Sequence, residues 1–388
     1  MRERQVLDGW KAICAYLKVD RRTAERRAKQ GMPVWGTGRK FAFTDQLDFW
    51  IENGRRRLEP ATASLSENVL TVYYHGDLSL WTYTFSNALS PETPREDSWR
   101  VRIASLETHS GKCVLVAVQF RSPVPGGVSA SELFCFANDG KLLWSVPADP
   151  RLIDRDGKPF PKAWRYKHMV VDEPSPSKNI WLAFANDAGW AGGVLRVDAA
   201  GSTKIQFANA GHVECLGIVE KNGDRWMVMC GENNDFDQAF TGIFSVNDPP
   251  ASSPLGKRQR YRYANAPSGN PLRYILFPPT ELIKARHHPY GHAKGLQVYS
   301  DDVIVDVDTG DGGAYFRYHF SPGLEPMYAF PSGSHEFRHR ALELEGSIGH
   351  SWQECPEIRK PVDLSIWEPG SGWRIELIPW RDTYPAGY

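Results

Sequence analysis

Two groups of histidines have the residue type and spacing that could bind a metal. The first is RHHPYGHAKG, with His287, His288 and His292, and the second is SHEFRHR, with His335 and His339. Histidines at i and i+4 on a helix are a common zinc-binding pair. Pro289 and Gly291 break any helix through the first group, and the second is interpreted as lacking the acidic residue that would complete a metalloprotease motif on its first histidine. We therefore predict hydrogen-bonded loop histidines, no metal site and no cofactor.

Two acidic segments resemble calcium loops but are predicted to be turns. The segment at 306–313 carries Asp306, Asp308 and Asp311, and the segment at 231–237 carries Asn233, Asn234, Asp235 and Asp237. The first lacks the glutamate that completes an EF-hand loop, and Asx-turns account for both. The sequence contains no GxSxG, Walker or GxGxxG motif. No catalytic residue is assigned, and an enzymatic role is left open without being favoured.

The N-terminal residues 6–53 predict a small helical module. Trp10, Ile13, Cys14 and Leu17 are spaced as one face of a helix. Asp20 is placed to cap a second helix that runs from about Arg21 to Gln30. A Gly-Thr-Gly hairpin follows, and Thr44 is placed to cap a third helix. Trp10, Leu17, Leu47 and Trp50 would form the core.

This arrangement resembles the excisionase-like and MerR-like winged helix-turn-helix domains. The matching segments are VDRRTAERRAKQG, MPVWGTGRKFAF and TDQLDFWI, about one eighth of the chain. The resemblance implies that the second helix enters the major groove and that the hairpin forms a wing. The side chains that would face DNA are Arg21, Arg22, Glu25, Arg26 and Lys29 on the helix, and Thr37, Arg39 and Lys40 in the wing. Arg27 departs from the family, whose members tend to have an apolar residue there.

The charge distribution agrees with that resemblance. Residues 1–60 contain 14 Lys or Arg against 8 Asp or Glu, whereas the remainder contains 32 against 38. A basic end attached to a mildly acidic body favours nucleic-acid binding by that end alone.

The remaining chain is predicted to be rich in strands. We expect a winged helix-turn-helix at 1–54, a linker at 55–68, and an all-β domain at 69–388, an α+β multidomain chain overall. Four hairpins of similar form, at 132–146, 192–207, 302–320 and 364–377, loosely resemble bacterial β-propeller repeats. They favour a five- or six-bladed propeller, with a β-sandwich as the alternative.

The composition indicates the cellular compartment in which the chain is expected. The six cysteines are scattered without a CxxC pair, which is ordinary for reduced cytosolic thiols. The chain shows neither an apolar signal core nor a run of about 18 apolar residues. We therefore expect a cytoplasmic protein that does not contact a membrane.

The expected function is that of a DNA-binding protein, either a transcriptional regulator or a DNA-targeted adaptor, with a β-rich sensor or protein-interaction domain. The expected partners are double-stranded DNA through residues 6–53, an unknown small molecule or protein through the β domain, and a second copy in a possible homodimer. The alternative is a propeller enzyme or ligand-binding protein with an accessory helix-turn-helix docking module. A third hypothesis is that the N-terminal module binds protein.

Overall fold

The structure is a computed structural model that describes residues 5–52, 59–74, 79–90, 100–106, 112–122, 130–173, 178–287, 291–309 and 313–380. Strands dominate these residues. The chain divides into two compact units, of which unit 1 contains residues 1–121 and 133–146 and unit 2 contains residues 122–132 and 147–388. Each unit is described by itself below.

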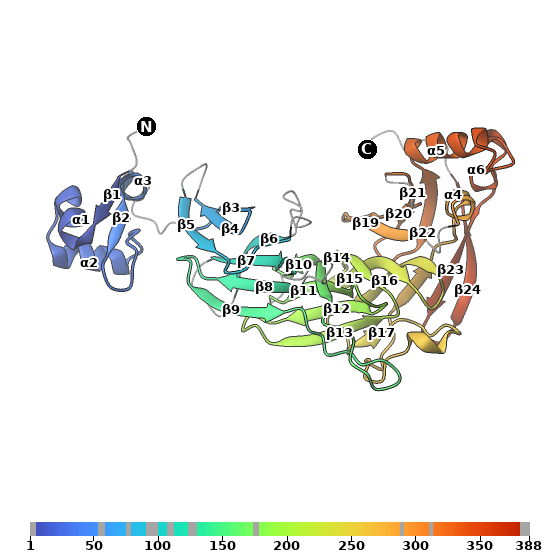
Figure 1. Ribbon diagram of the computed structural model, residues 1–388, viewed down its shortest axis with the longest axis horizontal. Helices are drawn as coiled ribbons and strands as arrows, with labels where there is room; N and C mark the ends of the chain where they lie inside the picture. The colour runs from blue at the N-terminus through green and yellow to red at the C-terminus, as the bar shows by residue number, and fades with distance from the viewer. Residues whose placement is uncertain are drawn as a thin grey trace. The chain divides into compact units, whose positions relative to one another are not determined.

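Unit 1 begins with three short helices and a two-stranded sheet. Its elements are β1 (Val6–Asp8), α1 (Gly9–Leu17), α2 (Arg21–Lys29), β2 (Phe41–Phe43) and α3 (Thr44–Glu52) (Figure 1). The Asp20 carboxylate caps α2 by accepting from the Thr23 amide at 2.8 Å. Gly36 has a φ of +94°, and a Cβ there would lie 2.2 Å from the Arg39 carbonyl oxygen, so this turn requires glycine. The buried core consists of Ile13, Ala24, Met32, Ala42, Leu47 and Trp50.

Two antiparallel sheets complete unit 1. One contains β3 (Thr62–Ser66), β4 (Val69–Tyr73) and β5 (Ser79–Thr84), and the other contains β6 (Val101–Ser105), β7 (Lys112–Gln119), β8 (Ser131–Phe136) and β9 (Leu142–Pro147). Aromatic side chains such as Phe85, Phe134 and Phe136 fill their shared core. Strand β3 occupies the second half of the segment expected to be a linker, and residues 55–58 of that segment lie outside the described residues.

Unit 2 contains three sheets (Figure 1). The five-stranded sheet has β10 (Trp164–Val171), β11 (Ile180–Asn186), β12 (Gly192–Val197), β13 (Thr203–Asn209) and β17 (Ala251–Ser252). The six-stranded sheet has, in order, β14 (Val213–Lys221), β15 (Asp224–Asn233), β16 (Gln238–Ser245), β18 (Arg273–Leu276), β23 (Val362–Glu368) and β24 (Gly372–Ile378). The four-stranded sheet has β19 (His292–Val298), β20 (Val303–Asp308), β21 (Tyr315–Phe320) and β22 (Pro326–Pro331).

Three α-helices lie in the C-terminal part of unit 2. They are α4 (Glu281–Ala285), α5 (Gly333–Leu344) and α6 (Pro356–Arg359), with short 3-10 turns η1 (Gln259–Tyr261) and η2 (Trp352–Glu354). They gather at one end of this unit in Figure 1. None of the helices in the described part of the chain is long and apolar enough to cross a membrane.

The expected fold class is wrong. The chain is mainly β rather than α+β, and its C-terminal part is not all-β, because α4, α5 and α6 lie within it. Nor is that part an array of equal blades, since its sheets range from three to six strands and the late strands β23 and β24 join a sheet with β14. The three helices of residues 9–52 do not establish a winged helix-turn-helix domain, and no family model matches them.

The local hairpins were better predicted than their assembly. The four expected hairpins are confirmed as the neighbouring strand pairs β8–β9, β12–β13, β20–β21 and β23–β24. Each depends on a turn and two adjacent segments, which the sequence encodes locally. The propeller prediction failed because it required equal spacing between these hairpins.

Trp50 gives a test of the N-terminal core. Its side chain is buried, so Trp50→Ala should lower the free energy of unfolding by about 3–5 kcal/mol. Trp50→Phe should cost less, because the buried indole nitrogen has no hydrogen-bond partner within the described residues and its removal leaves nothing unpaired. Urea unfolding followed by circular dichroism would compare the variants, and equal stability of wild type and Trp50→Ala would contradict this core.

Candidate metal centre

Helix α5 carries the second group of histidines and buries one face. The Ser332 hydroxyl caps the helix by accepting from the His335 amide at 3.1 Å. His335, His339 and Leu342 are spaced i, i+4 and i+7, which places them on one side of a helix, and all three are buried. The His335 ring packs edge-on against Phe316 of β21 at 5.7 Å between ring centroids. The prediction of loop histidines is therefore wrong for this pair.

The chain after α5 returns two more metal-ligating side chains to its buried face. His350 precedes η2, whose capping box is formed by Ser351 and Glu354, and Cys355 follows η2. The ligand atoms of His339, His350 and Cys355 all lie within 4.8 Å of one another. These three side chains are thus a candidate metal-binding group, and the expectation of no metal site stays an untested prediction.

The distance between the two imidazoles suits tetrahedral coordination. The Nε2 atoms of His339 and His350 lie 3.4 Å apart. Zinc–nitrogen bonds of about 2.0–2.1 Å at a tetrahedral angle would hold two ligand nitrogens about 3.3–3.4 Å apart. The same separation is long for a hydrogen bond between the two rings but still within its range. The geometry of the pair is therefore compatible with a shared cation as well as with a weak hydrogen bond.

Burial sets the protonation state of these groups. Burial, with the neighbouring His350, lowers the pKa of His339, which favours the neutral ring that binds metals. Burial raises the pKa of the Cys355 thiol to about 11. A metal that binds the thiolate would displace this proton.

A histidine–carboxylate pair, His335 with Glu357, adjoins the cluster of His339, His350 and Cys355. The Nε2 atom of His335 lies 3.1 Å from the Glu357 carboxylate, and the other oxygen of that carboxylate accepts from the Glu281 amide at 2.5 Å. Trp352 packs against both His335 and His339, with ring centroids 6.0 and 5.1 Å away. The structure thus separates the two histidines of α5, since His335 pairs with Glu357 and His339 faces His350.

The sequence itself contains a signal for part of this site. Residues 335–339, HEFRH, match H-E-x-x-H, because Glu336 follows the first histidine. The interpretation that no acidic residue completes this motif is therefore wrong. In the structure Glu336 binds Arg340 at 2.8 Å, and both side chains are more than two-fifths exposed. The carboxylate that would act as the general base is thus engaged on the solvent side of α5.

The other candidate ligands belong to separate groups. His287 is exposed, His288 lies outside the described residues, and His292 begins β19. Asp306 forms a two-pronged ion pair with Arg317 at 2.7 and 2.8 Å. Asp311 also lies outside the described residues.

The loop after β15 is confirmed as a turn. The amide of Asp235 donates to the Asn233 side chain at 2.9 Å, which is an Asx-turn contact. The Asp235 carboxylate accepts from the amides of Gly256 and Arg258, each at 2.7 Å, and pairs with Arg262 at 2.9 Å. These protein donors already occupy the carboxylate oxygens that a calcium ion would need as ligands.

Glu232, at the end of β15, is the centre of a second cluster of ionisable groups in unit 2. Its side chain is buried and contacts the Nδ1 atoms of His212, at 3.2 Å, and of His292. Burial alone would raise the pKa of Glu232, but the hydrogen bond with His292 and the charges of both histidines outweigh burial and lower that pKa. The carboxylate is therefore ionised at neutral pH.

His212 is held from both sides of its ring. Its Nε2 lies 3.2 and 3.1 Å from the carbonyl oxygens of Asn186 and Gly189, while Nδ1 faces Glu232. Both ring nitrogens thus face acceptors, which occupies them and leaves no lone pair directed at a metal. We interpret this cluster as a charge network that joins the strands around it.

The structure places the residues expected to bind DNA on α2 and in the turn before β2. Arg22, Arg26 and Lys29 are exposed on α2. Arg21 pairs with Glu25 on the same helix at 2.8 Å. Internal partners thus reduce the free positive charge that the resemblance implies for this helix.

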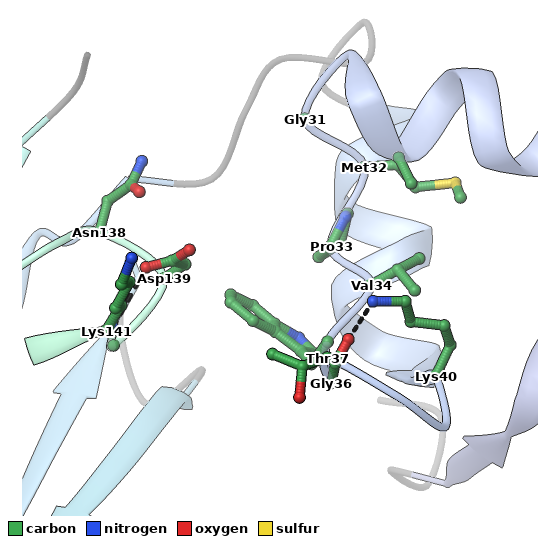
Figure 2. A pocket seen from close by; sticks show the side chains of 13 residues that line it. Gly31, Met32, Pro33, Val34, Gly36, Thr37, Lys40, Asn138, Asp139 and Lys141 are labelled. Atoms are coloured by element: carbon green, nitrogen blue, oxygen red, sulfur yellow. Dashed lines mark hydrogen bonds between the residues drawn. The ribbon is translucent and has the colours of Figure 1, made fainter. Parts of the chain in front are cut away.

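The turn residues are also engaged. Arg39 pairs with Asp8 at 2.6 Å. Figure 2 shows Thr37 and Lys40 at a hollow of about 630 Å³ within unit 1, where the Lys40 ammonium donates to the Gly36 carbonyl. Three of the basic side chains expected on DNA therefore have partners inside the chain.

Comparisons with known proteins find similar solved structures but no family. No family model and no curated protein matches the chain. The similar solved structures include a eukaryotic initiation factor (8% identity over 70% of this chain and 62% of that chain, TM-score 0.31). They also include a cobalt-substituted Synechocystis apocarotenoid oxygenase (11%, 69% and 66%, TM-score 0.29) and a Dos1 propeller (9%, 68% and 63%, TM-score 0.30). At such TM-scores these similarities do not define a shared fold.

The expected main function, a DNA-binding regulator of transcription, is corrected accordingly. No family model supports a DNA-binding domain, and Arg21, Arg39 and Lys40 have partners inside the chain. Double-stranded DNA as a partner of residues 6–53 stays an untested prediction.

The Glu232 network predicts a pH-dependent contribution to stability. Because the folded pKa of Glu232 is lowered, its stabilisation is present above the unfolded value of about 4.3 and is lost as the pH falls through the folded pKa. Glu232→Gln should lower the free energy of unfolding by about 2–3 kcal/mol at pH 7, and this difference should shrink as the pH falls toward 3.

Chemical unfolding at several pH values would measure this difference. Glu220→Gln is a matched control, because Glu220 is exposed and lies 3.6 Å from Arg225, and it should cost less than about 0.5 kcal/mol. A difference for Glu232→Gln that does not change with pH would refute the ionised state of this carboxylate.

Proposed function

We propose that this chain is a zinc-binding protein whose site consists of His339, His350 and Cys355 in unit 2. The observation that carries the proposal is the convergence of these ligand atoms within 4.8 Å, with the two imidazole nitrogens 3.4 Å apart. Imidazole and thiolate are the ligands that zinc prefers, whereas magnesium and calcium prefer oxygen.

Rigid elements hold these ligands in place. His339 is on α5, His350 is anchored next to the capping box of η2, and Cys355 precedes Pro356 at the start of α6. His339 and Cys355 are buried while His350 is partly exposed, so a metal can be approached from the His350 side. A site on supported elements loses less conformational freedom when it binds its metal.

Three protein ligands fit the pattern of a zinc site with one open position. Zinc is almost always four-coordinate, and sites with three protein ligands hold a water or another ligand in the fourth position. When bound, the metal would polarise that molecule as a Lewis acid. This places the proposal within the enzyme or ligand-binding alternative.

The H-E-x-x-H motif does not extend the proposal to peptide hydrolysis. That mechanism requires both histidines on one zinc and the glutamate beside it. Here His335 pairs with Glu357, and Glu336 pairs with Arg340 on the exposed side of α5. The site therefore supports metal binding, and no catalytic role is assigned to Glu336.

Zinc titration tests the proposal directly. The purified full chain, stripped with a chelator, should take up one zinc ion per chain in competition with a chromophoric chelator. His339→Ala and Cys355→Ser should each weaken binding at least about a hundredfold, because each removes a ligand rather than a supporting contact. Zinc at a hundred times its Kd should stabilise the wild type by about 2.7 kcal/mol.

His287→Ala serves as the matched control, since His287 is an exposed histidine outside the cluster. It should bind zinc as the wild type does. His350→Ala provides a variant at a partly exposed position, so that lost binding can be separated from lost folding by circular dichroism. Zinc binding that survives in all three cluster variants would refute the site.

A further inference from the structure

Strand β24 is an edge strand that exposes its apolar side chains rather than its charged ones. It forms one end of the six-stranded sheet and pairs with β23 on its inner side. Trp373, Ile375 and Leu377 are 38%, 63% and 62% exposed, whereas the alternate residues Arg374 and Glu376 are partly covered. Ile375 and Leu377 therefore face solvent, Trp373 also packs against Phe236 at 5.0 Å between ring centroids, and the charged side chains lie on the more covered face.

No strand in the described part of the chain pairs with the outer edge of Trp373–Leu377. Beyond this segment the chain meets β22, where the Ala329 amide donates to the Pro379 carbonyl at 3.1 Å. A flat, apolar edge of this kind offers backbone donors and acceptors to another chain, and proteins normally protect such edges with charges or bulges. Figure 1 shows β24 at the margin of its sheet, next to β23.

We propose that this edge binds a second copy of the chain, by antiparallel pairing of β24 with β24 about a two-fold axis at Ile375. The axis would place Ile375 opposite the partner's Ile375 and Trp373 opposite the partner's Leu377. It would also place Arg374 opposite the partner's Glu376, and Glu376 opposite the partner's Arg374. The segment Trp-Arg-Ile-Glu-Leu is thus self-complementary in both polarity and charge.

The neighbouring registers lack this complementarity. Residues directly opposite each other in an antiparallel pair point to the same face of the sheet. A two-fold axis perpendicular to the sheet must therefore lie midway between the two copies of one residue. An axis at Arg374 opposes two arginines, and an axis at Glu376 opposes two glutamates. Only the axis at Ile375, among these three central positions, opposes unlike charges.

The charged pair already has partners within one chain. Arg374 contacts Glu376 at 2.9 Å and Glu368 at 2.8 Å. Pairing would add the partner's carboxylate beside the same guanidinium, which can donate five hydrogen bonds. An edge of this length buries less surface than a standard interface, so we expect a dimer that forms at micromolar rather than nanomolar concentration.

A charge exchange tests both the partner and the register. Arg374→Glu places two glutamates across the axis, and Glu376→Arg places two arginines across it, so each variant alone should be monomeric. Mixed together, the two variants should form a heterodimer, because each residue then opposes an unlike charge. Sedimentation velocity at tens of micromolar should show wild type as a dimer, each variant as a monomer, and the mixture as a dimer.

The mixture separates pairing from folding, since a misfolded variant would not regain assembly with another variant. Ile375→Lys should also yield a monomer, because it opposes two lysines on the axis. Leu255→Lys is its matched control, since Leu255 is an equally exposed apolar residue outside β24. A wild type that is monomeric, or a mixture that stays monomeric, would overturn the proposal. Either result is also what we would expect if the C-terminal tail or another protein, rather than a second copy, covers this edge.

Discussion

The burial of one face of α5 against the four-stranded sheet is the constraint on which the proposed metal centre depends. This face presents His339 to the interior, where burial lowers the pKa of the imidazole and keeps it neutral. The capped turn after the helix then returns His350 and Cys355 to the same side. If α5 were exposed, these three groups would be separate polar side chains with no shared centre.

The two clusters of ionisable side chains in unit 2, around Glu232 and around Cys355, differ in a way that clarifies what a metal site requires. Around Glu232, every ring nitrogen of His212 faces a protein acceptor, so the charges compensate one another within the chain. Around Cys355, the Nε2 atoms of His339 and His350 face each other at 3.4 Å, a long hydrogen-bond distance that also suits two ligands of one cation. The first arrangement stabilises the fold by itself, whereas we propose that a cation completes the second.

Sequence patterns predicted local elements better than their assembly. The Asp-and-Gly turns predicted the hairpins β12–β13 and β20–β21, because a turn and its flanking strands are neighbours in the chain. The pairing of β18 with β23 joins residues about ninety positions apart, and no local pattern encodes it. Helix α5 escaped prediction because histidines occupy two of the three positions on its buried face, which weakens its hydrophobic periodicity. The H-E-x-x-H signal was present in the sequence, but His350 and Cys355 join His339 only through the fold.

X-ray absorption at the zinc edge, measured on the zinc-loaded full chain, tests the central claim most directly. The account predicts two nitrogen ligands at about 2.0–2.1 Å and one sulfur ligand at about 2.3 Å, with a further light atom in the remaining position. A coordination shell of nitrogen and oxygen alone would show that Cys355 is not a ligand and would contradict the site described here.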